Sequence, residues 1–293
     1  LTKLILPNVG LITNISYAHI KNFKNLKGIA SAKSEIMNNI HPGGIIVLNK
    51  DDKFYDFFIN KAKKKKLKIT SFSMKNNADI SFKTMKKINK NYYLFLKIRK
   101  KIKKFKLKES IKSYIPNILA VVAVISNFYN FSKIKENIFY NYNLINGRGD
   151  IFKLKIKNKI INIVNESYNS NPLSLKFALN NFEKMNIKSN LKNLLLGDML
   201  ELGRSSKMLH KEIAKMINQS KVNKVYVFGK YIRNTFNKIK TQKKGIILNN
   251  KEDIKNLIMN KINSNEYLMV KASNGTGLFN MISKMKSKGI NAI

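Results

Sequence analysis

The side chains best suited to chemistry lie in the stretch NESYNSNP, which ends at Pro172 and separates an apolar run from a helical pattern. Glu166, Tyr168 and Asn169 offer a carboxylate, an aromatic face and an amide close together. A carboxylate at the carboxyl end of a strand can accept both hydroxyls of a ribose. Asn171 and Pro172, in contrast, are residue types that begin helices. The residues alone favour a helix cap and a ligand loop equally.

Two later stretches also follow apolar runs. Asp198 and Glu201 lie in GDMLELG, where paired carboxylates could bind a metal, an amine or a hydroxyl, and a solvated loop with a helix cap is the alternative. Lys271 and Ser273 precede a glycine pair in VKASNGTGL. Backbone amides of that loop could cradle an anion, but an ordinary tight turn between strand and helix explains it at least as well.

Two residues of the first half have weaker claims. His19 follows a strand-like run, and a lone His there is more often a polar loop residue than a ligand. Lys33 lies in a helical pattern, two positions from Glu35, which it does not face. Physical chemistry alone therefore assigns neither residue a function.

The second half of the chain must position most of these residues. Strand-like and helix-like patterns alternate from about residue 159, which predicts right-handed crossovers and a mostly parallel sheet covered on both faces. Ligands bind such sheets at the carboxyl ends of the strands, where all three stretches fall. The predicted strands are 159–164, 193–197, 224–229, 245–249 and 267–272, and the predicted helices are 172–185, 206–219, 231–239, 251–262 and a last one after the glycine pair.

The first half has a less regular α/β pattern. Its predicted strands are 8–15, 43–49, 92–98 and 103–109, the last two paired antiparallel, and its predicted helices are 25–39, 51–66 and 116–130. The turn NGRG at 146–149 is the best boundary because glycines flank it and a new strand–helix series follows. We therefore predict an α/β fold with two domains, residues 1–146 and 147–293.

Composition limits the class of protein. A chain of 293 residues with 44% apolar content can bury one large core or two ordinary ones. The absence of Cys excludes disulfides and thiolate metal sites. No apolar run has the length of a membrane span, and no signal peptide is evident, so we expect a cytoplasmic protein. The chain begins with Leu and opens on a strand-like run, which suggests a fragment whose upstream part is missing.

The net charge of +41 raises the possibility of nucleic-acid binding. Only 4 of the 57 basic residues are Arg, although Arg is favoured for reading bases and gripping phosphates. Lys, Asn and Ile are over-used together, as AT-rich codons would produce, and we favour that explanation. The densest runs, at 63–66 and 97–108, could contact anionic surfaces, but a solvated helix end and an exposed hairpin are preferred.

Several stretches together resemble the Mur ligases. PNVGLITNISYAHIKNFKNLKGIASAKSEI, NGRGD, NESYNSNP, LLLGDMLELG with His210 downstream, and VKASNG occur in the order and spacing of that family. The resemblance is strongest to the branch that adds D-alanyl-D-alanine, because SYNSNP resembles its D-S-Y-N-A-N-P and GDMLELG resembles its G-D-M-x-E-L-G. It covers essentially the whole chain.

The resemblance implies the later part of a central ATPase-type α/β domain, followed by a Rossmann-like C-terminal domain. The N-terminal domain and the phosphate-binding loop would lie upstream, so we expect this chain alone to be inactive. The implied reaction uses ATP and Mg²⁺ to join D-alanyl-D-alanine to UDP-N-acetylmuramoyl-tripeptide through an acyl phosphate, in peptidoglycan precursor synthesis. A monomer that binds no specific nucleic acid is expected. The alternatives are the ligase that adds the third stem-peptide residue, and a basic nucleic-acid-binding α/β protein.

The resemblance also implies roles for single residues. His19 would bind Mg²⁺, and so would Lys33 once CO₂ had converted its amine into a carbamate. Arg148 would contact the ATP phosphates and, with His19 and Lys33, form the catalytic set. Glu166 would bind the ribose, and the residues beside the nucleotide would be Asn117, Tyr168 and Asn169. The residues facing the dipeptide would be Asp198, Glu201, Lys271 and Ser273.

The sequence departs from the family pattern in four places. IKSY at 111–114 replaces G-x-H-N, so an adenine contact is lost or replaced, while Asn117 still matches the Asn that follows. Asn165 and Glu166 each stand where the family has Asp, and Ala272 replaces a Gly. These changes indicate either drift in an AT-rich genome or weakened use of ATP.

Overall fold

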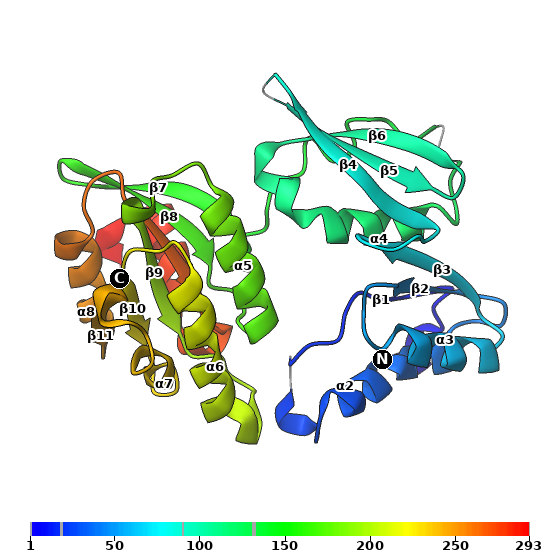
Figure 1. Ribbon diagram of the computed structural model, residues 1–293, viewed down its shortest axis with the longest axis horizontal. Helices are drawn as coiled ribbons and strands as arrows, with labels where there is room; N and C mark the ends of the chain where they lie inside the picture. Colours follow the sequence, from blue (N-terminus) through cyan, green and yellow to red (C-terminus); the bar gives the residue numbers. More distant parts are fainter. Residues whose placement is uncertain (1, 18–19, 90, 131–132, 293) are drawn as a thin grey trace. The chain divides into compact units, whose positions relative to one another are not determined.

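The computed structural model describes residues 2–17, 20–89, 91–130 and 133–292 (Figure 1). The chain forms two compact units. The first comprises residues 1–16 and 23–143, and the second comprises residues 17–22 and 144–293. Within the described residues no helix is both long and apolar enough to cross a membrane.

The first unit is built on a six-stranded sheet in the order β1-β2-β3-β4-β5-β6. The pairs from β1 to β4 are parallel, and β4, β5 and β6 pair antiparallel. The strands are β1 (Val9–Ile12), β2 (Ile45–Asn49), β3 (Lys68–Ser73), β4 (Ile80–Ile88), β5 (Asn91–Ile98) and β6 (Lys101–Leu107). The helices are α1 (Thr2–Ile5), α2 (Leu26–Ser34), α3 (Tyr55–Lys64) and α4 (Ile115–Ile125).

Two strands of this sheet were not predicted. In β3 the residues that face inward include Ser71 and Ser73, which are buried but bonded to carboxylates. Because these serines interrupt the apolar pattern, sequence periodicity does not reveal the strand. β4 ends in three exposed residues, and its lysines hide it in the same way. The helices are also shorter than predicted, since α2 passes into a 3₁₀ turn (Glu35–Asn39) and α4 ends at Ile125.

The second unit has a six-stranded sheet in the order β11-β10-β9-β12-β8-β7. All neighbouring pairs are parallel except β7 with β8. The strands are β7 (Asp150–Ile156), β8 (Lys159–Glu166), β9 (Lys192–Gly197), β10 (Val225–Phe228), β11 (Lys244–Leu248) and β12 (Tyr267–Lys271). β12 is last in the chain but lies between β9 and β8, so the strand order reverses there. Such a reversal is where ligands bind α/β sheets.

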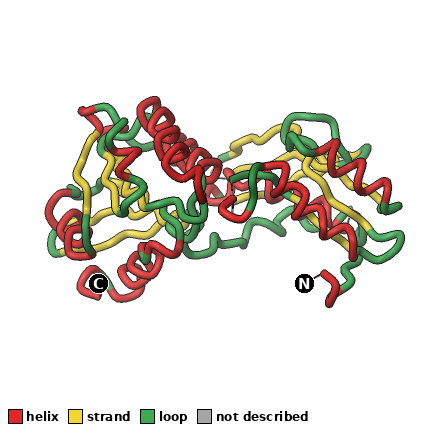
Figure 2. Tube along the Cα trace, turned by 90° about the horizontal axis from the view of Figure 1, so that it is seen from below, coloured by secondary structure: helices red, strands yellow, loops and turns green. Residues whose placement is uncertain are grey.

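Helices cover both faces of this second sheet (Figure 2). They are α5 (Pro172–Lys184), α6 (Ser206–Gln219), α7 (Arg233–Phe236), α8 (Lys251–Asn256) and α9 (Leu278–Lys288). Alternate strand residues such as Ile161, Leu195 and Val270 form one buried cluster with α8 and α9. The predicted alternation is confirmed, although β7, in which exposed lysines alternate with buried Leu154 and Ile156, was not predicted, and α7 is shorter than predicted.

Candidate functional site

The carboxyl edge of the second sheet gathers most of the predicted site residues. Glu166 is the last residue of β8, Lys271 the last of β12, and Asp198 directly follows β9. β7 runs in the opposite direction and pairs Asp150 with Asn165, so its first residues reach the same edge. Arg148 lies two residues before the start of β7, so it lies on this edge as well.

A buried ion pair marks the point where the strand order reverses. Lys271 and Glu166 are directly paired between β12 and β8, and Lys271 Nζ lies 3.5 Å from Glu166 Oε2. The Lys271 side chain is 2% exposed and that of Glu166 is 14% exposed. Burial raises the pKa of Glu166 and lowers that of Lys271, and in each case the partner's charge opposes the shift. The charge of each group therefore favours the ionised form of the other.

The loop after β8 contains the helix cap that its sequence suggested, and it also contributes polar groups next to the ion pair. Asn171 Oδ1 accepts from Ser174 N at 2.9 Å, and Ser174 Oγ accepts from Asn171 N at 3.0 Å. This capping box begins α5 and confirms the predicted helix start. Upstream of the cap, the Asn169 carbonyl accepts from Lys271 Nζ at 2.7 Å. The Asn169 side chain is exposed beside the ion pair, and Tyr168 is 38% exposed.

Asn165 explains one of the departures from the family pattern. It is fully buried, and its amide nitrogen donates to Asn146 Oδ1 at 3.0 Å. Its Oδ1 accepts from Ser167 Oγ at 2.6 Å and from Ser167 N at 3.3 Å. An ionised carboxylate could accept from Ser167 but could not donate to Asn146. The amide thus fits this place without an uncompensated buried charge.

The GDMLELG loop is held by its own polar groups. Asp198 is buried, and its carboxylate accepts from Ile232 N at 2.7 Å and from Lys230 N at 3.1 Å. A side chain at Gly229 would collide with that carboxylate, since a Cβ there would lie 2.5 Å from Asp198 Cγ. The carboxylate therefore fixes the loop after β10. Glu201 is exposed and has a positive φ of 62°.

His210 and Ser273 hold the same loop from other sides. His210 is fully buried, its Nε2 accepts from Met199 N at 3.1 Å, and its Nδ1 lies 2.7 Å from the Ser206 carbonyl. A neutral imidazole protonated on Nδ1 satisfies both contacts, and burial lowers the pKa of His210. Ser273 Oγ accepts from Leu200 N at 2.9 Å and donates to the Ser170 carbonyl at 3.2 Å. It thereby connects the loops after β9 and β8.

A pocket of about 370 Å³ opens at the carboxyl ends of β10 and β11. Two of its lining residues, Lys230 and Arg233, are cations, and none is an acid. The lining residues are Phe228, Gly229, Lys230, Arg233, Leu248 and Asn249. Arg233 Nη2 donates to Asn249 Oδ1 at 2.7 Å, which orients the guanidinium. Lys230 and Arg233 were not among the predicted site residues, although Gly229 at the end of the predicted strand 224–229 was a signal. The Asp198 carboxylate accepts from Lys230 N, which ties the loop after β9 to one residue of the pocket lining.

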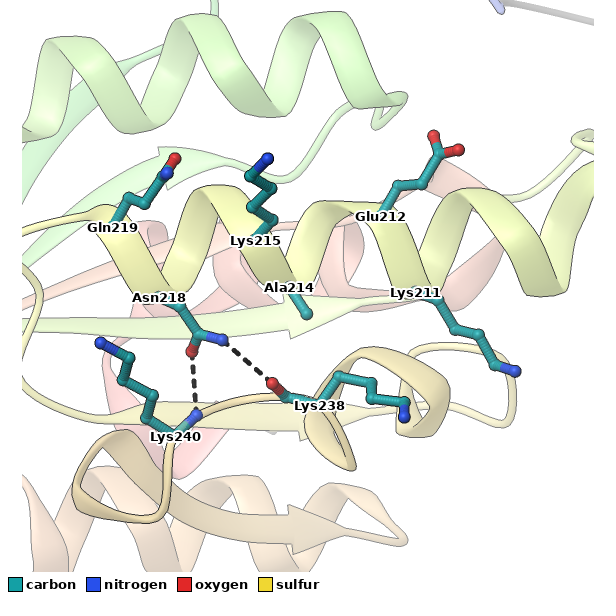
Figure 3. Close-up of a pocket in the computed structure, with 8 residues that line it drawn as sticks. All are labelled: Lys211, Glu212, Ala214, Lys215, Asn218, Gln219, Lys238 and Lys240. Carbon is teal, nitrogen blue, oxygen red and sulfur yellow. Dashed lines mark hydrogen bonds between the residues drawn. The ribbon is translucent and has the colours of Figure 1, made fainter.

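A larger pocket, of about 530 Å³, lies along α6 (Figure 3). Its residues are Lys211, Glu212, Ala214, Lys215, Asn218, Gln219, Lys238 and Lys240. Asn218 bonds both the Lys238 carbonyl and Lys240 N, which ties α6 to the segment before β11. That segment leads to the amino end of β11, so this pocket lies away from the carboxyl edge of the sheet. It contains no predicted site residue.

Two of the predicted residues belong to the first unit, Lys33 in α2 and Asn117 in α4. Lys33 Nζ donates to the Asn14 carbonyl at 2.9 Å. Partial burial lowers the pKa of Lys33, while the charge of Asp52 opposes the shift. Asn117 is exposed in the first turn of α4. His19 lies outside the described residues.

The surroundings of Lys33 can be tested against a magnesium site. Mg²⁺ prefers oxygen ligands. A lowered pKa leaves more of the amine neutral, which is the form that adds CO₂, and the resulting carbamate would place oxygens near the Asn14 carbonyl and the Asp52 carboxylate. The donor chemistry therefore fits. In the described part of the chain, no three His, Asp or Glu side chains converge without that modification.

Comparison with known proteins gives matches to both units. Residues 1–125 match the family described as the Mur ligase middle domain, and residues 147–274 match the Mur ligase glutamate ligase domain. A UDP-N-acetylmuramoyl-tripeptide–D-alanyl-D-alanine ligase of Buchnera aphidicola subsp. Baizongia pistaciae is 31% identical over 278 residues, which are 93% of this chain and 57% of the relative. The enzyme of that name from Rickettsia prowazekii is 26% identical over 95% of this chain and 61% of its own.

Solved structures share the fold. MurF from Acinetobacter baumannii has a TM-score of 0.82 at 21% identity, covering 98% of this chain and 61% of its own. MurF ligase from Thermotoga maritima in complex with ADP has a TM-score of 0.78 at 20% identity, covering 99% of this chain and 64% of its own. The chain thus spans about three fifths of the length of these relatives.

Proposed function

The chain belongs to the Mur ligase family, and we propose that it is the greater part of an ATP-dependent ligase that joins D-alanyl-D-alanine to UDP-N-acetylmuramoyl-tripeptide. The relatives that carry this activity by name support the substrate pair. The observation that carries the proposal is the convergence of Arg148, Glu166 and Lys271 on one sheet edge, beside a pocket lined by cations. That edge offers a carboxylate for hydroxyls and fixed cations for phosphates and carboxylates.

The reaction forms an amide in two transfers. A carboxylate oxygen of the tripeptide attacks the γ-phosphorus of ATP, which gives an acyl phosphate and ADP. The amine of D-alanyl-D-alanine then attacks the acyl carbon, loses a proton, and displaces inorganic phosphate, which keeps the attacking carboxylate oxygen. Little covalent chemistry is required of the protein, so its contribution is positioning and neutralisation of charge.

On this proposal Glu166 accepts the ribose hydroxyls. The charge of Lys271 favours the ionised carboxylate, because it opposes the rise in the Glu166 pKa that burial causes. Asn169 lies beside it with an exposed amide, and Arg148 supplies a cation that cannot lose its charge to phosphate oxygens. When bound, Mg²⁺ supplies neutralisation of phosphate charge, and Lys33 as a carbamate, with His19, would hold it.

Lys230 and Arg233 suit the carboxylate of the incoming dipeptide. They line a pocket without an acid at the same edge. Asp198 would act through them, because its own carboxylate is committed to Lys230 N and Ile232 N. The proposed role of Asp198 is therefore to fix the loop that carries Lys230 and Arg233, and that of Ser273 is to hold the loop that carries Asp198.

Acceptor specificity in the complete protein tests the proposal. Hydrolysis of ATP is measured with UDP-tripeptide and each acceptor in turn. We expect turnover only when both UDP-tripeptide and D-alanyl-D-alanine are present. Equal turnover with meso-diaminopimelate or lysine on the UDP-dipeptide would assign the chain to the ligase that adds the third residue instead.

A further inference from the structure

The turn that carries Arg148 is packed on one face of α9. Three α9 residues spaced by four and three positions, Phe279, Ser283 and Lys286, lie on the same side of the helix. Ser283 Oγ accepts from Asn146 Nδ2 at 2.8 Å. Lys286 Nζ lies 2.7 Å from Asp150 Oδ2. These two contacts hold the two ends of the turn, before and after Arg148.

The centre of the turn is held by close packing. Gly147 has a φ of +79°, and a Cβ there would lie 2.6 Å from the Phe279 ring and 2.9 Å from Tyr168 Cβ. Its amide donates to Asp150 Oδ1 at 2.6 Å, so Lys286 and Gly147 bind the two oxygens of one carboxylate. Any residue other than glycine would push the turn away from α9.

The Arg148 side chain itself has an aromatic support. Its Cζ lies 4.5 Å from the centroid of the Tyr168 ring. The Phe279 ring packs against the Tyr168 ring in a T-shaped arrangement, with ring centroids 5.3 Å apart and an interplanar angle of 88°. Tyr168 N also donates to the Gly147 carbonyl at 3.1 Å, so backbone and ring are fixed to the same turn. Planar guanidinium groups stack well on aromatic faces, which restricts the direction in which their N–H groups point.

We propose that Tyr168, Phe279 and Lys286 are positioning residues for Arg148. They fix its guanidinium as part of the second unit, so that the cation already has its orientation when the phosphates of ATP reach it. A catalytic cation that needs no reorganisation lowers the barrier more than a mobile one. The inference rests on the proposed function of Arg148. It gives Tyr168 a function of its own, as the support of the cation beside the nucleotide.

The first experiment does not depend on activity. The Nε–Hε group of Arg148 is observed by NMR in the complete protein and assigned with Arg148→Lys. Stacking on Tyr168 should shift this signal upfield, Tyr168→Phe should keep the shift, and Tyr168→Leu should abolish it. Lys286→Met should reduce the shift, whereas Lys284→Met should not, because Lys284 is an exposed lysine of the same helix. A signal that is unchanged in Tyr168→Leu overturns the proposal.

The second experiment is a double-mutant cycle on ATP-dependent ligation. Tyr168→Leu should lower kcat at least tenfold and Tyr168→Phe less than twofold. In an Arg148→Ala background, Tyr168→Leu and Lys286→Met should each change kcat less than twofold, because their effect passes through Arg148. If Tyr168→Leu and Lys286→Met lowered kcat as much in the Arg148→Ala background as in the wild type, their function would be purely structural and the inference would be refuted. An inactive wild type would instead refute the proposed function, and the NMR result would still decide the positioning.

Discussion

Removing the buried cation at the strand reversal gives the sharpest prediction about the second unit. Lys271→Met keeps the length and apolar stem of the side chain but deletes its charge. The variant loses contacts of 2.7 Å to the Asn169 carbonyl, 3.4 Å to the Glu166 carbonyl and 3.5 Å to Glu166 Oε2. It leaves a carboxylate that is 14% exposed without its partner.

Two effects set the magnitude. Breaking a buried pair from one side costs about 3–5 kcal/mol. The long distance to Oε2, and a Glu166 pKa already raised by burial, allow the carboxyl group to take up a proton instead of remaining charged. We therefore expect the lower end, about 3 kcal/mol, which is roughly a hundredfold in an equilibrium constant.

Hydrogen exchange at the amides of β8 and β12 measures this cost, since it reports the opening of one unit separately from the other. Exchange should be about a hundredfold faster in Lys271→Met. Adding Glu166→Gln should recover at least half of the free energy, because a neutral amide avoids the cost of either burying the unpaired carboxylate or protonating it. The exposed Lys284→Met variant should change the free energy of opening by less than about 0.5 kcal/mol. Unchanged exchange in Lys271→Met, or no recovery in the double variant, would refute the reasoning.

Three further outcomes follow from the structure. Asn171→Ala should destabilise the second unit by about 1 kcal/mol through loss of the capping box, seen as faster exchange in α5, while Asn171→Ser should retain most of it. With ¹³C-bicarbonate, Lys33 should give a carbamate ¹³C signal at a lower pH than ordinary lysines, because its pKa is lowered, and Lys33→Arg should lack that signal. The folded-state pKa of His210 is lowered, so the unfolded chain binds more protons between the two pKa values. The contribution of His210 to stability should accordingly be fully present above about pH 6.5 and be lost as the pH falls towards the folded-state pKa. A pH-independent stability of the loop at 198–205 would contradict this.

Periodicity predicts the second sheet because its central strands are apolar on both faces and its helices have clear caps such as Asn171. It fails for β3, where Ser71 and Ser73 replace apolar residues and bond to carboxylates. In β7 exposed lysines alternate with buried Leu154 and Ile156, a half-buried strand pattern that the prediction did not include. Sequence also indicates that Glu166 and Asp198 lie at the ligand edge. It cannot indicate that Asp198 binds amides 32 and 34 positions later, since that depends on how β10 packs beside β9.

The stacking of Arg148 on Tyr168 was equally hidden. The two residues are 20 positions apart, and they meet only because β7 runs antiparallel to β8 and returns its first residues to the ligand edge. Local patterns find strands, caps and polar loops. Contacts that depend on sheet order require the tertiary structure.

The origin of the phosphate oxygens tests the central claim most directly. The complete protein is incubated with ATP, D-alanyl-D-alanine and a UDP-tripeptide that carries ¹⁸O in both oxygens of its reacting carboxylate. Mass spectrometry should find the amide product, and one ¹⁸O in each molecule of released phosphate, because the attacking oxygen leaves with phosphorus. Unlabelled phosphate, or hydrolysis of ATP without amide product, would contradict ligation through an acyl phosphate.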